Sequence, residues 1–195
     1  EGPLALGAKA IFEAFWHTGR RKVGGAWDDG PHTLRSNHNR KARKAMNKAL
    51  RQSFNGAKKE LFLTTPYFVP DAKTMHAIKH AARRGVDVRL LVPRKSDAAI
   101  VKWAARAAYA NLLHSGVRIF EYLPRMIHAK SFVVDSSVTM LGSANMDYRS
   151  FFLNYEAIVL SRDTSLAASL REDFLKDLKQ SEEVLASRWK SRGIA

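Results

Sequence analysis

The sequence contains no cysteine. The chain can therefore form no disulfide and offers no thiolate to a zinc ion, which agrees with a reducing compartment. It also lacks an apolar run of the roughly 20 residues that a bilayer-spanning helix needs. No secretory signal is visible, but the sequence starts at Glu1 without an initiator Met, so this absence says little about what precedes it.

Acidic residues are scarce. The 18 Asp and Glu stand against 33 Lys and Arg, which gives a formal net charge of +15. This excess favours anionic partners, namely nucleic acid, acidic lipid headgroups or phosphorylated substrates, and charge alone does not choose among them. The 195 residues, 46% of them hydrophobic, fit one large domain or one compact half of a bigger protein with a real core.

The first part of the chain precedes the predicted domain. Apolar residues recur at helical spacing from Leu4 to Trp16, which predicts an amphipathic helix. The following stretch carries consecutive basic side chains, paired aspartates and a Gly-Pro turn, which predicts a long basic loop. We therefore expect residues 1–36 to form this helix and connecting loop, and residues 37–195 to form the domain.

Helices and strands alternate over the rest of the sequence. Helical periodicity predicts helices over residues 39–54, 72–84, 96–114, 165–178 and 182–189. Apolar runs between turn residues predict strands over residues 60–64, 86–92, 117–122, 129–134, 138–141 and 155–160. Asn37 or Asn39 is expected to cap the first of these helices, and Ser96 or Asp97 the third. The alternation predicts an α/β fold with a mixed, partly parallel sheet flanked by helices on both faces, and with the functional site at strand ends.

The densest group of chemically useful side chains lies between Ile127 and Arg149. Its members are His128, Lys130, Asp135, Gly142, Ser143 and Asn145. If a strand starts at Ala129, the imidazole and the ammonium project from the same face, because side chains alternate along a strand. After a turn, the hydroxyl and the amide return to the same end, and the glycine allows close backbone approach. An imidazole, an ammonium, a hydroxyl and an amide in one small volume suit a phosphate.

The pattern His-x-Lys-x4-Asp at residues 128–135, followed by Gly-Ser-x-Asn at residues 142–145, matches the HKD signature of the phospholipase D superfamily. Other stretches resemble the carboxyl-terminal half of bacterial cardiolipin synthases. They are TPYFVPD at 65–71, VPRKSD at 92–97, HSGVRIFEY at 114–122 and DYRSFFLNYE at 147–156. The resemblance covers nearly the whole chain, is strongest from Leu61 to Leu160, and implies one phospholipase D-type half.

The resemblance also implies a mechanism without metal or cofactor. In this superfamily one histidine attacks phosphorus to give a phosphohistidine, and a second protonates the leaving alkoxide. His128 would be the general acid/base, with the nucleophile as the alternative role. Lys130 and Asn145 would hold the non-bridging oxygens of the phosphate, and Ser143 would hydrogen-bond in the same pocket. Glu156 would orient the imidazole and favour its required tautomer.

Two signature residues are expected to be structural. Asp135 should point away from the site and hold the hairpin in place. Gly142 should allow the backbone to approach closely. Tyr67, in an aromatic turn after a strand, is the candidate for lining the substrate. His76 and His80 have a spacing that can bind metal on a helix, but basic residues surround them and no acidic third ligand is near, so no metal site is predicted.

Cardiolipin synthases carry two HKD motifs in one chain, whereas this sequence contains one. A complete site then needs a second HKD half, either in the same parent chain or in a homodimer. The leading hypothesis is phosphatidyl transfer that makes cardiolipin from phosphatidylglycerol. We expect the chain to bind this anionic phospholipid at the membrane surface, on the cytoplasmic face of the bacterial inner membrane. The alternatives are a homodimeric, metal-independent phosphodiesterase of nucleic acid and an inactive half that only binds anionic lipid.

Overall fold

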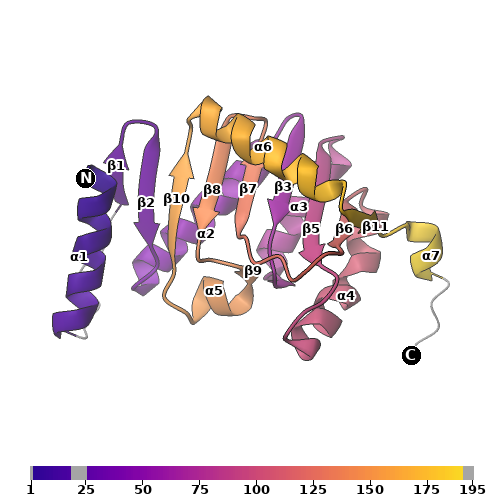
Figure 1. Ribbon diagram of the computed structural model, residues 1–195, viewed down its shortest axis with the longest axis horizontal. Coiled ribbons are helices and arrows are strands. Elements are labelled where there is room, and N and C mark those ends of the chain that lie inside the picture. The colour runs from indigo at the N-terminus through magenta and orange to yellow at the C-terminus, as the bar shows by residue number, and fades with distance from the viewer. Residues whose placement is uncertain (1, 19–25, 191–195) are drawn as a thin grey trace.

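A nine-stranded mixed sheet forms the centre of the protein in a computed structural model that describes residues 2–18 and 26–190 (Figure 1). Along the sheet the strands follow the order β1-β2-β10-β8-β7-β3-β5-β6-β11. Their bounds are β1 Ala26–Asp29, β2 His32–Ser36, β3 Glu60–Thr64, β5 Asp87–Pro93, β6 Arg118–Tyr122, β7 Ser131–Val134, β8 Val138–Gly142, β10 Ala157–Ser161 and β11 Ser181–Glu183. A second, two-stranded sheet pairs β4 (Phe68–Val69) with β9 (Met146–Asp147) in parallel.

The predicted mixed sheet is confirmed, and its parallel part is narrow. Only the β3–β5 and β5–β6 pairs of the large sheet are parallel within the described residues. Each of these pairs is joined through a helix, as parallel strands require. The antiparallel β7–β8 pair is instead a hairpin with a short turn.

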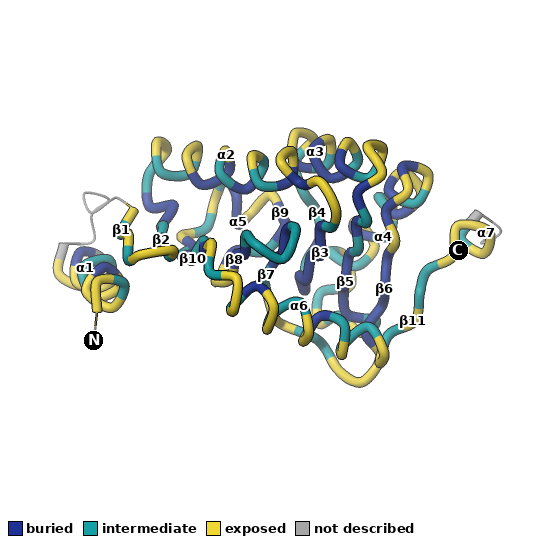
Figure 2. Tube along the Cα trace, turned by 90° about the horizontal axis from the view of Figure 1, so that it is seen from above, coloured by how far each residue is buried: buried dark blue, intermediate teal, exposed yellow. Residues whose placement is uncertain are grey.

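Helices lie on both faces of the sheet, as the sequence predicts. Figure 2 shows α2, α3 and α4 on one face, α6 on the other, and α1 and α7 at the two ends. The helix bounds are α1 Pro3–Thr18, α2 Arg40–Gly56, α3 Ala72–Arg83, α4 Ala99–His114, α5 Tyr148–Phe152, α6 Thr164–Leu178 and α7 Ala186–Lys190. No helix in the described part of the chain is both long enough and apolar enough to cross a bilayer.

The core follows from the alternation of side chains along β3. Leu61 and Leu63 are buried in the large cluster that also takes in Ile78 of α3. Phe62, which points the other way, stacks on Phe174 of α6 with ring centroids 4.8 Å apart. The central strands are therefore covered by apolar side chains on both faces, which holds their ends in fixed positions.

The prediction of a basic loop before residue 37 is wrong for residues 26–36, which form the β1–β2 hairpin. Residues 19–25 lie outside the described part of the chain. β2 pairs with β10, a strand more than 100 residues later. The hairpin is short and mostly polar, so its strands give no periodic signal of their own, and their distant partner is invisible to local reading. Whether residue 36 ends a separate segment stays a prediction, but β1 and β2 belong to the large sheet.

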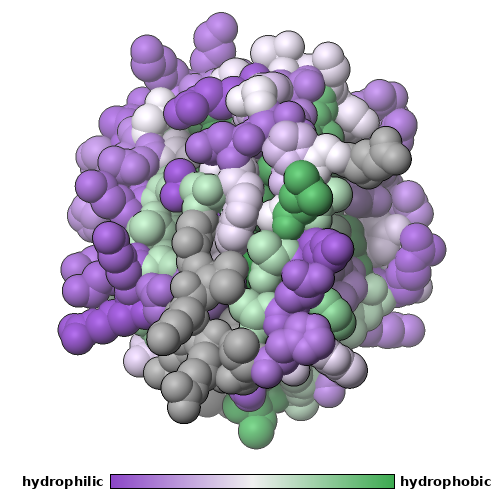
Figure 3. Space-filling view, turned by 90° about the vertical axis from the view of Figure 1, so that its left-hand side faces the viewer, coloured by the Kyte–Doolittle hydropathy of each residue, from purple (hydrophilic) through white to green (hydrophobic). Residues whose placement is uncertain are grey.

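The amphipathic helix predicted near the start is present as α1, but its faces differ from expectation. Gly7 and Ala14 are buried, and a Cβ on Gly7 would lie 2.6 Å from Cγ of Trp27 in β1. The large apolar side chains of Leu6, Phe12 and Trp16 are instead 60–73% exposed. Figure 3 shows the end of the molecule that carries α1, where apolar surface lies among polar side chains.

Three further element predictions are wrong. Residues 181–183 form the edge strand β11 and not the start of a helix, because they pair with β6. Helix α4 starts after Ala98 with no side-chain cap, so neither Ser96 nor Asp97 caps it. Strand β7 starts at Ser131 and not at Ala129.

Candidate active site

The predicted phosphate-binding side chains come together at one edge of the large sheet. Strands β3 and β8 end at this edge, and β7 and β10 begin there, because β7 is antiparallel to both β3 and β8 and β10 is antiparallel to β8. The short helix α5 and strand β9, which pairs with β4, lie at the same edge, at the lower side of Figure 1. Segments far apart in the sequence, such as the end of β3 at Thr64 and the start of β10 at Ala157, therefore meet here.

His128 and Lys130 lie in the extended segment that leads into β7. The Lys130 Nζ donates a hydrogen bond to the His128 carbonyl oxygen at 2.8 Å. The Gly142 N–H donates to the Lys130 carbonyl at 3.3 Å, so the pairing with β8 reaches past the strand's first residue. Partial burial lowers the pKa of the Lys130 ammonium, against the opposing pull of the Glu156 and Asp147 carboxylates. The Lys130 ammonium is thus held by the His128 carbonyl, at the sheet edge where Glu156 also lies.

Tyr67 lies beside the His128 imidazole. The two ring centroids are 6.3 Å apart, and the rings meet edge to face at 84°. The Tyr67 hydroxyl donates to Asp97 Oδ1 at 2.7 Å, and this hydrogen bond raises the pKa of the phenol. Asp97, predicted to cap a helix, holds this tyrosine instead. Tyr67 therefore lies beside His128, and its role in lining a substrate stays a prediction.

Ser143 joins the end of β8 to the start of β10. Its hydroxyl donates a short hydrogen bond to Glu156 Oε2 and accepts one from the Ala157 N–H at 3.1 Å. Gly142 makes this approach possible, because a Cβ there would lie 2.4 Å from the Ala157 carbonyl oxygen. The glycine of the signature is thus required by the packing of β8 against β10.

The Glu156 side chain is buried, and both of its carboxylate oxygens accept hydrogen bonds from nearby side chains. Its Oε1 accepts from the Ser150 hydroxyl at 2.7 Å and from Asn154 Nδ2 at 3.4 Å. Among the described residues, no hydrogen bond joins this carboxylate to His128. Its predicted role as the group that orients the imidazole stays a prediction.

Asn145 has one polar atom without a partner. Its backbone N–H donates to the Ser150 hydroxyl at 3.0 Å, but its buried Oδ1 makes no hydrogen bond within the described part of the chain. A buried amide oxygen left unpaired costs free energy, which a polar ligand would recover. Asp147, two residues on, caps α5 through the Ser150 N–H at 2.7 Å, and burial raises the pKa of its carboxyl group.

Sequence reasoning missed two side chains that hold this site. Asn37 is fully buried at the end of β2, and it was considered only as a helix cap, a role that Asn39 takes by accepting from Ala42 N. The Asn37 Oδ1 accepts from the Glu156 backbone N–H at 2.6 Å, and the Asn37 backbone N–H donates to the Glu156 carbonyl at 3.0 Å. Its Nδ2 donates to the Ser150 carbonyl at 2.9 Å. Ser150, buried as well, was recognisable only as part of the Asp147-x-x-Ser150 capping pattern.

Thr65 connects the aromatic turn to the signature loop. Its hydroxyl donates to the Tyr67 carbonyl at 2.9 Å and accepts from the Met146 N–H at 3.2 Å. This contact extends the parallel β4–β9 pair, in which Phe68 is opposite Met146. The turn that carries Tyr67 and the loop that carries Asn145 are therefore fixed relative to each other.

Asp135 lies at the far end of β7 from His128. Its carboxylate accepts hydrogen bonds from the backbone N–H groups of Lys58, Lys59 and Glu60 at 2.9, 2.7 and 3.0 Å. Partial burial raises the pKa of this carboxyl, but the hydrogen bonds outweigh it, and the pKa is lowered. Asp135 thus ties the β7–β8 turn to the start of β3 and does not enter the site.

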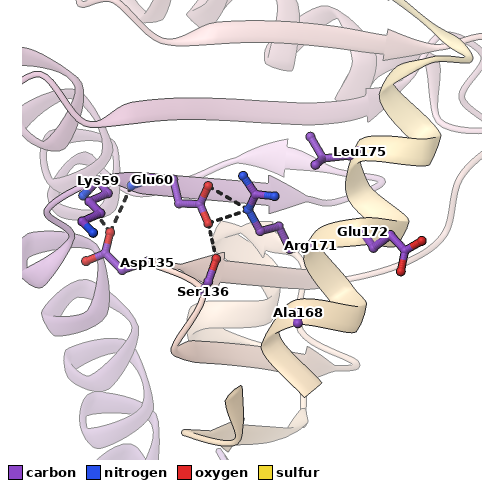
Figure 4. A pocket seen from close by; sticks show the side chains of 8 residues that line it. All are labelled: Lys59, Glu60, Asp135, Ser136, Ala168, Arg171, Glu172 and Leu175. Carbon is purple, nitrogen blue, oxygen red and sulfur yellow. Dashed lines mark hydrogen bonds and ion pairs between the residues drawn. The ribbon is translucent and has the colours of Figure 1, made fainter. Parts of the chain in front are cut away.

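A surface cavity of about 500 Å³ lies beside this turn and is lined by residues of β3 and α6 (Figure 4). Inside it, Arg171 Nε and the Ser136 hydroxyl donate to Glu60 Oε1 at 2.8 and 2.6 Å. These polar groups satisfy one another. The cavity lies at the opposite end of β7 from His128, so it contributes nothing to the site.

The described residues contain no cluster of three or more His, Cys, Asp or Glu that could hold a metal ion. His76 and His80 of α3 stack on each other with ring centroids 5.9 Å apart. His80 Nδ1 lies within hydrogen-bond distance of Arg84 Nη1. This pair is therefore engaged with a cation and lies on the α2–α4 face of the sheet.

Comparison with known proteins assigns the family. Residues 50–178 match the family described as cardiolipin synthase, PLD-like domain. The chain is 41% identical over 140 residues to a cardiolipin synthase of Clostridium perfringens (strain SM101 / Type A), and 43% identical over 138 residues to cardiolipin synthase 2 of Bacillus anthracis. These matches cover 72% and 71% of this chain. The chain belongs to the cardiolipin synthase family.

The cardiolipin synthase resemblance that the sequence predicts is thus confirmed. The matched region makes up 29% and 27% of the two relatives, so the chain spans less than a third of their length. Solved structures share the fold of this cardiolipin synthase domain. They include Nuc from Salmonella typhimurium, a phospholipase D family member, with a TM-score of 0.66 and 22% identity over 79% of this chain and 97% of that one. NucT from Helicobacter pylori has a TM-score of 0.64 and 18% identity over 78% of this chain and 98% of that one.

Proposed function

We propose that this chain supplies one half of an active site for phosphatidyl transfer, and that the assembled enzyme makes cardiolipin from two molecules of phosphatidylglycerol. The observation that carries the proposal is the meeting of His128, Lys130 and the Ser143–Glu156 pair at one sheet edge, in a chain of the cardiolipin synthase family. The missing half is a second HKD half-site, in the same parent chain or in a second copy.

The reaction takes place in two steps. In the first, a histidine of the second half attacks phosphorus, so that an N–P bond forms and the P–O bond to the glycerol headgroup breaks. His128 gives its proton to the departing oxygen, and glycerol leaves. In the second, His128 takes a proton from the glycerol hydroxyl of another phosphatidylglycerol, whose oxygen attacks phosphorus and breaks the N–P bond. If His128 is instead the nucleophile, the two histidines exchange these roles.

The other site residues act on charge and position. Lys130 stabilises the negative charge that develops on the non-bridging oxygens, and the Asn145 Nδ2 donates a hydrogen bond to the same oxygens. The Ser143–Glu156 pair forms the adjoining wall of the pocket. The net charge of +15 holds the enzyme at the anionic, cytoplasmic face of the inner membrane.

Substitution of the signature residues His128 and Lys130 tests this function in the full-length parent enzyme. His128→Ala and Lys130→Ala should each lower cardiolipin formation from labelled phosphatidylglycerol by about 10²–10⁴-fold, the usual worth of a general acid or an electrostatic contact. The thermal unfolding midpoint should stay unchanged, because neither side chain is buried in the core. His76→Ala, an exposed histidine on α3, is the matched control and should leave the rate unaltered.

Synthesis retained by either variant would remove these residues from the site.

A phosphodiesterase of nucleic acid is the competing function, and the excess of basic residues is the observation that favours it. Cleavage of DNA by the purified chain in the presence of a chelator, lost on His128→Ala, would establish that function in place of lipid transfer.

A further inference from the structure

Helix α4 presents apolar residues on two faces. Its inner face packs on the sheet and is buried at Ala105, Tyr109 and Leu112. The exposed apolar positions are Ala99, Ile100, Trp103, Ala104, Ala107 and Ala110. Ile100 is 85% exposed and Trp103 is 65% exposed. A helix of a globular domain normally turns polar side chains outward, so this second apolar face calls for a partner.

The exposed face begins next to the candidate active site. The His128 ring contacts the Tyr67 ring, and the Tyr67 hydroxyl is hydrogen-bonded to Asp97. Asp97 lies two residues before the start of α4. Ile100 and Trp103, three residues apart, project from the first turns of the helix. Figure 1 shows that this end of α4 reaches the site edge of the sheet and projects past α5.

The charges around this face suit a surface of negative charge. The 16 residues of α4 include no Asp or Glu. Lys95 is exposed just before the helix, and Lys102, which lies between Ile100 and Trp103 in the sequence, is partly exposed. Arg106 forms an ion pair with Glu121 at 2.8 Å, so its charge is already paired within the protein. A tryptophan and an isoleucine beside free cations are typical of helices that lie in the headgroup region of anionic bilayers.

We propose that the first turns of α4 insert into an anionic phospholipid bilayer, with Ile100 and Trp103 entering the boundary between headgroups and acyl chains. Lys95 and Lys102 then contact the lipid phosphates. This docking brings the sheet edge that holds His128 to the depth at which a phosphodiester lies, while the acyl chains of the substrate stay in the membrane. The inference rests on the proposed function in so far as the substrate is a membrane lipid, but docking is measurable without turnover.

Vesicle binding by the purified chain tests the surface directly. The chain should sediment with vesicles of phosphatidylcholine and phosphatidylglycerol, and much less with phosphatidylcholine alone. Ile100→Ser combined with Trp103→Ser should weaken binding about tenfold, because two apolar side chains no longer leave water. Phe12→Ser with Trp16→Ser on α1 is the matched control, with side chains that are 60% and 73% exposed at another end of the molecule. Circular dichroism should be unchanged for both pairs.

A second measurement locates the tryptophan. Brominated phosphatidylcholine in the vesicles should quench part of the fluorescence of the unsubstituted chain. Trp103→Phe keeps an apolar aromatic ring, so it should bind as before while losing most of that quenching. Lys95→Gln with Lys102→Gln should remove much of the preference for phosphatidylglycerol and of the sensitivity to salt.

Three outcomes would overturn the proposal. They are normal vesicle binding by the Ile100/Trp103 variant, an equal loss in the α1 control, and quenching that persists in Trp103→Phe. If the Ile100/Trp103 variant binds vesicles normally but loses synthesis in the parent enzyme, this face packs against another part of that protein. The His128→Ala chain should bind vesicles normally, so failure of the docking and failure of the catalytic assignment are told apart.

Discussion

Asn37 lies far from the HKD signature in the sequence, but its hydrogen bonds hold residues of the candidate site. Through its side chain and its backbone N–H it joins the Glu156 main chain to the end of β2, and it also bonds the Ser150 carbonyl. Glu156 and Ser150 in turn form the wall that includes Ser143. We infer that Asn37 is a positioning residue, which acts on the phosphate pocket through the carboxylate and never touches substrate.

Asn37→Ala tests this role. Loss of the amide leaves the Glu156 N–H and the Ser150 carbonyl without partners, so the free energy of unfolding should fall by about 2 kcal/mol. Turnover of the parent enzyme should also fall, with a changed pH profile of kcat, because the carboxylate is held less firmly. Asn37→Asp keeps the acceptor for the Glu156 N–H and should restore part of the rate.

The matched control is Asn47→Ala. Asn47 is buried in α2 and donates to the Phe151 carbonyl at 3.1 Å, but it makes no hydrogen bond to Glu156 within the described part of the chain. It should lose comparable stability while the pH profile stays as in the unsubstituted enzyme. Identical profiles for the two variants would show that Asn37 serves the fold alone.

How much of the site can be read from the sequence depends on how local each signal is. The positions of His128, Lys130 and Ser143 follow from a pattern with fixed spacing, and the structure brings them to one sheet edge. Asn37 is more than 100 residues from Glu156, and its neighbour Asn39 competes for the local capping role. Only the pairing of β2 with β10 reveals that Asn37 contacts Glu156 while Asn39 caps the helix.

At the scale of elements, the turn between β7 and β8 is held by Asp135. Asp135 and Ser136 both have left-handed backbone conformations, with φ of 50° and 51°. Asp tolerates this conformation better than most residues, and its carboxylate also receives the three N–H groups at the start of β3. The turn therefore fixes a hairpin and a third strand together.

Asp135→Asn keeps the turn conformation but loses one acceptor oxygen and the charge. The free energy of unfolding at pH 7 should fall by about 1 kcal/mol, measured by urea denaturation. The folded-state pKa of Asp135 is below its ordinary value of 3.8, so its stabilisation is complete above that value and is lost as the pH falls through the lower, folded-state pKa. The difference between the two proteins should therefore shrink below about pH 4. A difference that stays constant in acid would contradict the role of the charge.

The elements that escaped prediction are those with little apolar periodicity. Residues 26–36 contain few apolar side chains and were expected to be a loop, and residues 181–183 are a polar edge strand. Both are defined by pairing with a neighbour and not by their own pattern. The buried strands β3, β5 and β6 were predicted within one residue of their observed bounds, because continuous apolar runs mark them.

At the scale of the whole molecule, the site has one wall. All of its catalytic candidates come from one domain, and His128 is exposed at the sheet edge. A chain that remains a monomer of 21.9 kDa by light scattering should therefore convert no phosphatidylglycerol, since the proposed mechanism needs a second histidine from another HKD half. Turnover should appear only in species of at least twice that mass or in the two-motif parent enzyme. A monomer with turnover would show that one HKD motif suffices.

The overall architecture was predictable because strand and helix patterns alternate through the middle of the chain. That alternation requires crossovers, which create the parallel β3–β5–β6 part, while the short turn after Asp135 requires an antiparallel hairpin. The order of the outer strands was not predictable, because antiparallel edges can be extended by any segment with free backbone groups. The first 36 residues illustrate this, since their hairpin extends the sheet beyond β10.

The β7–β8 turn also sets a limit on insertions. Val134 pairs with Val138 beside the turn, and Ser131 pairs with Leu141 beside the site. One extra residue in the turn, without a compensating bulge, would shift this register and reverse the faces of every later β8 side chain. Ser143 would then leave Glu156, although the insertion lies at the opposite end of the strand. The length of a turn that never meets substrate is thus set by the chemistry at the other end of its hairpin.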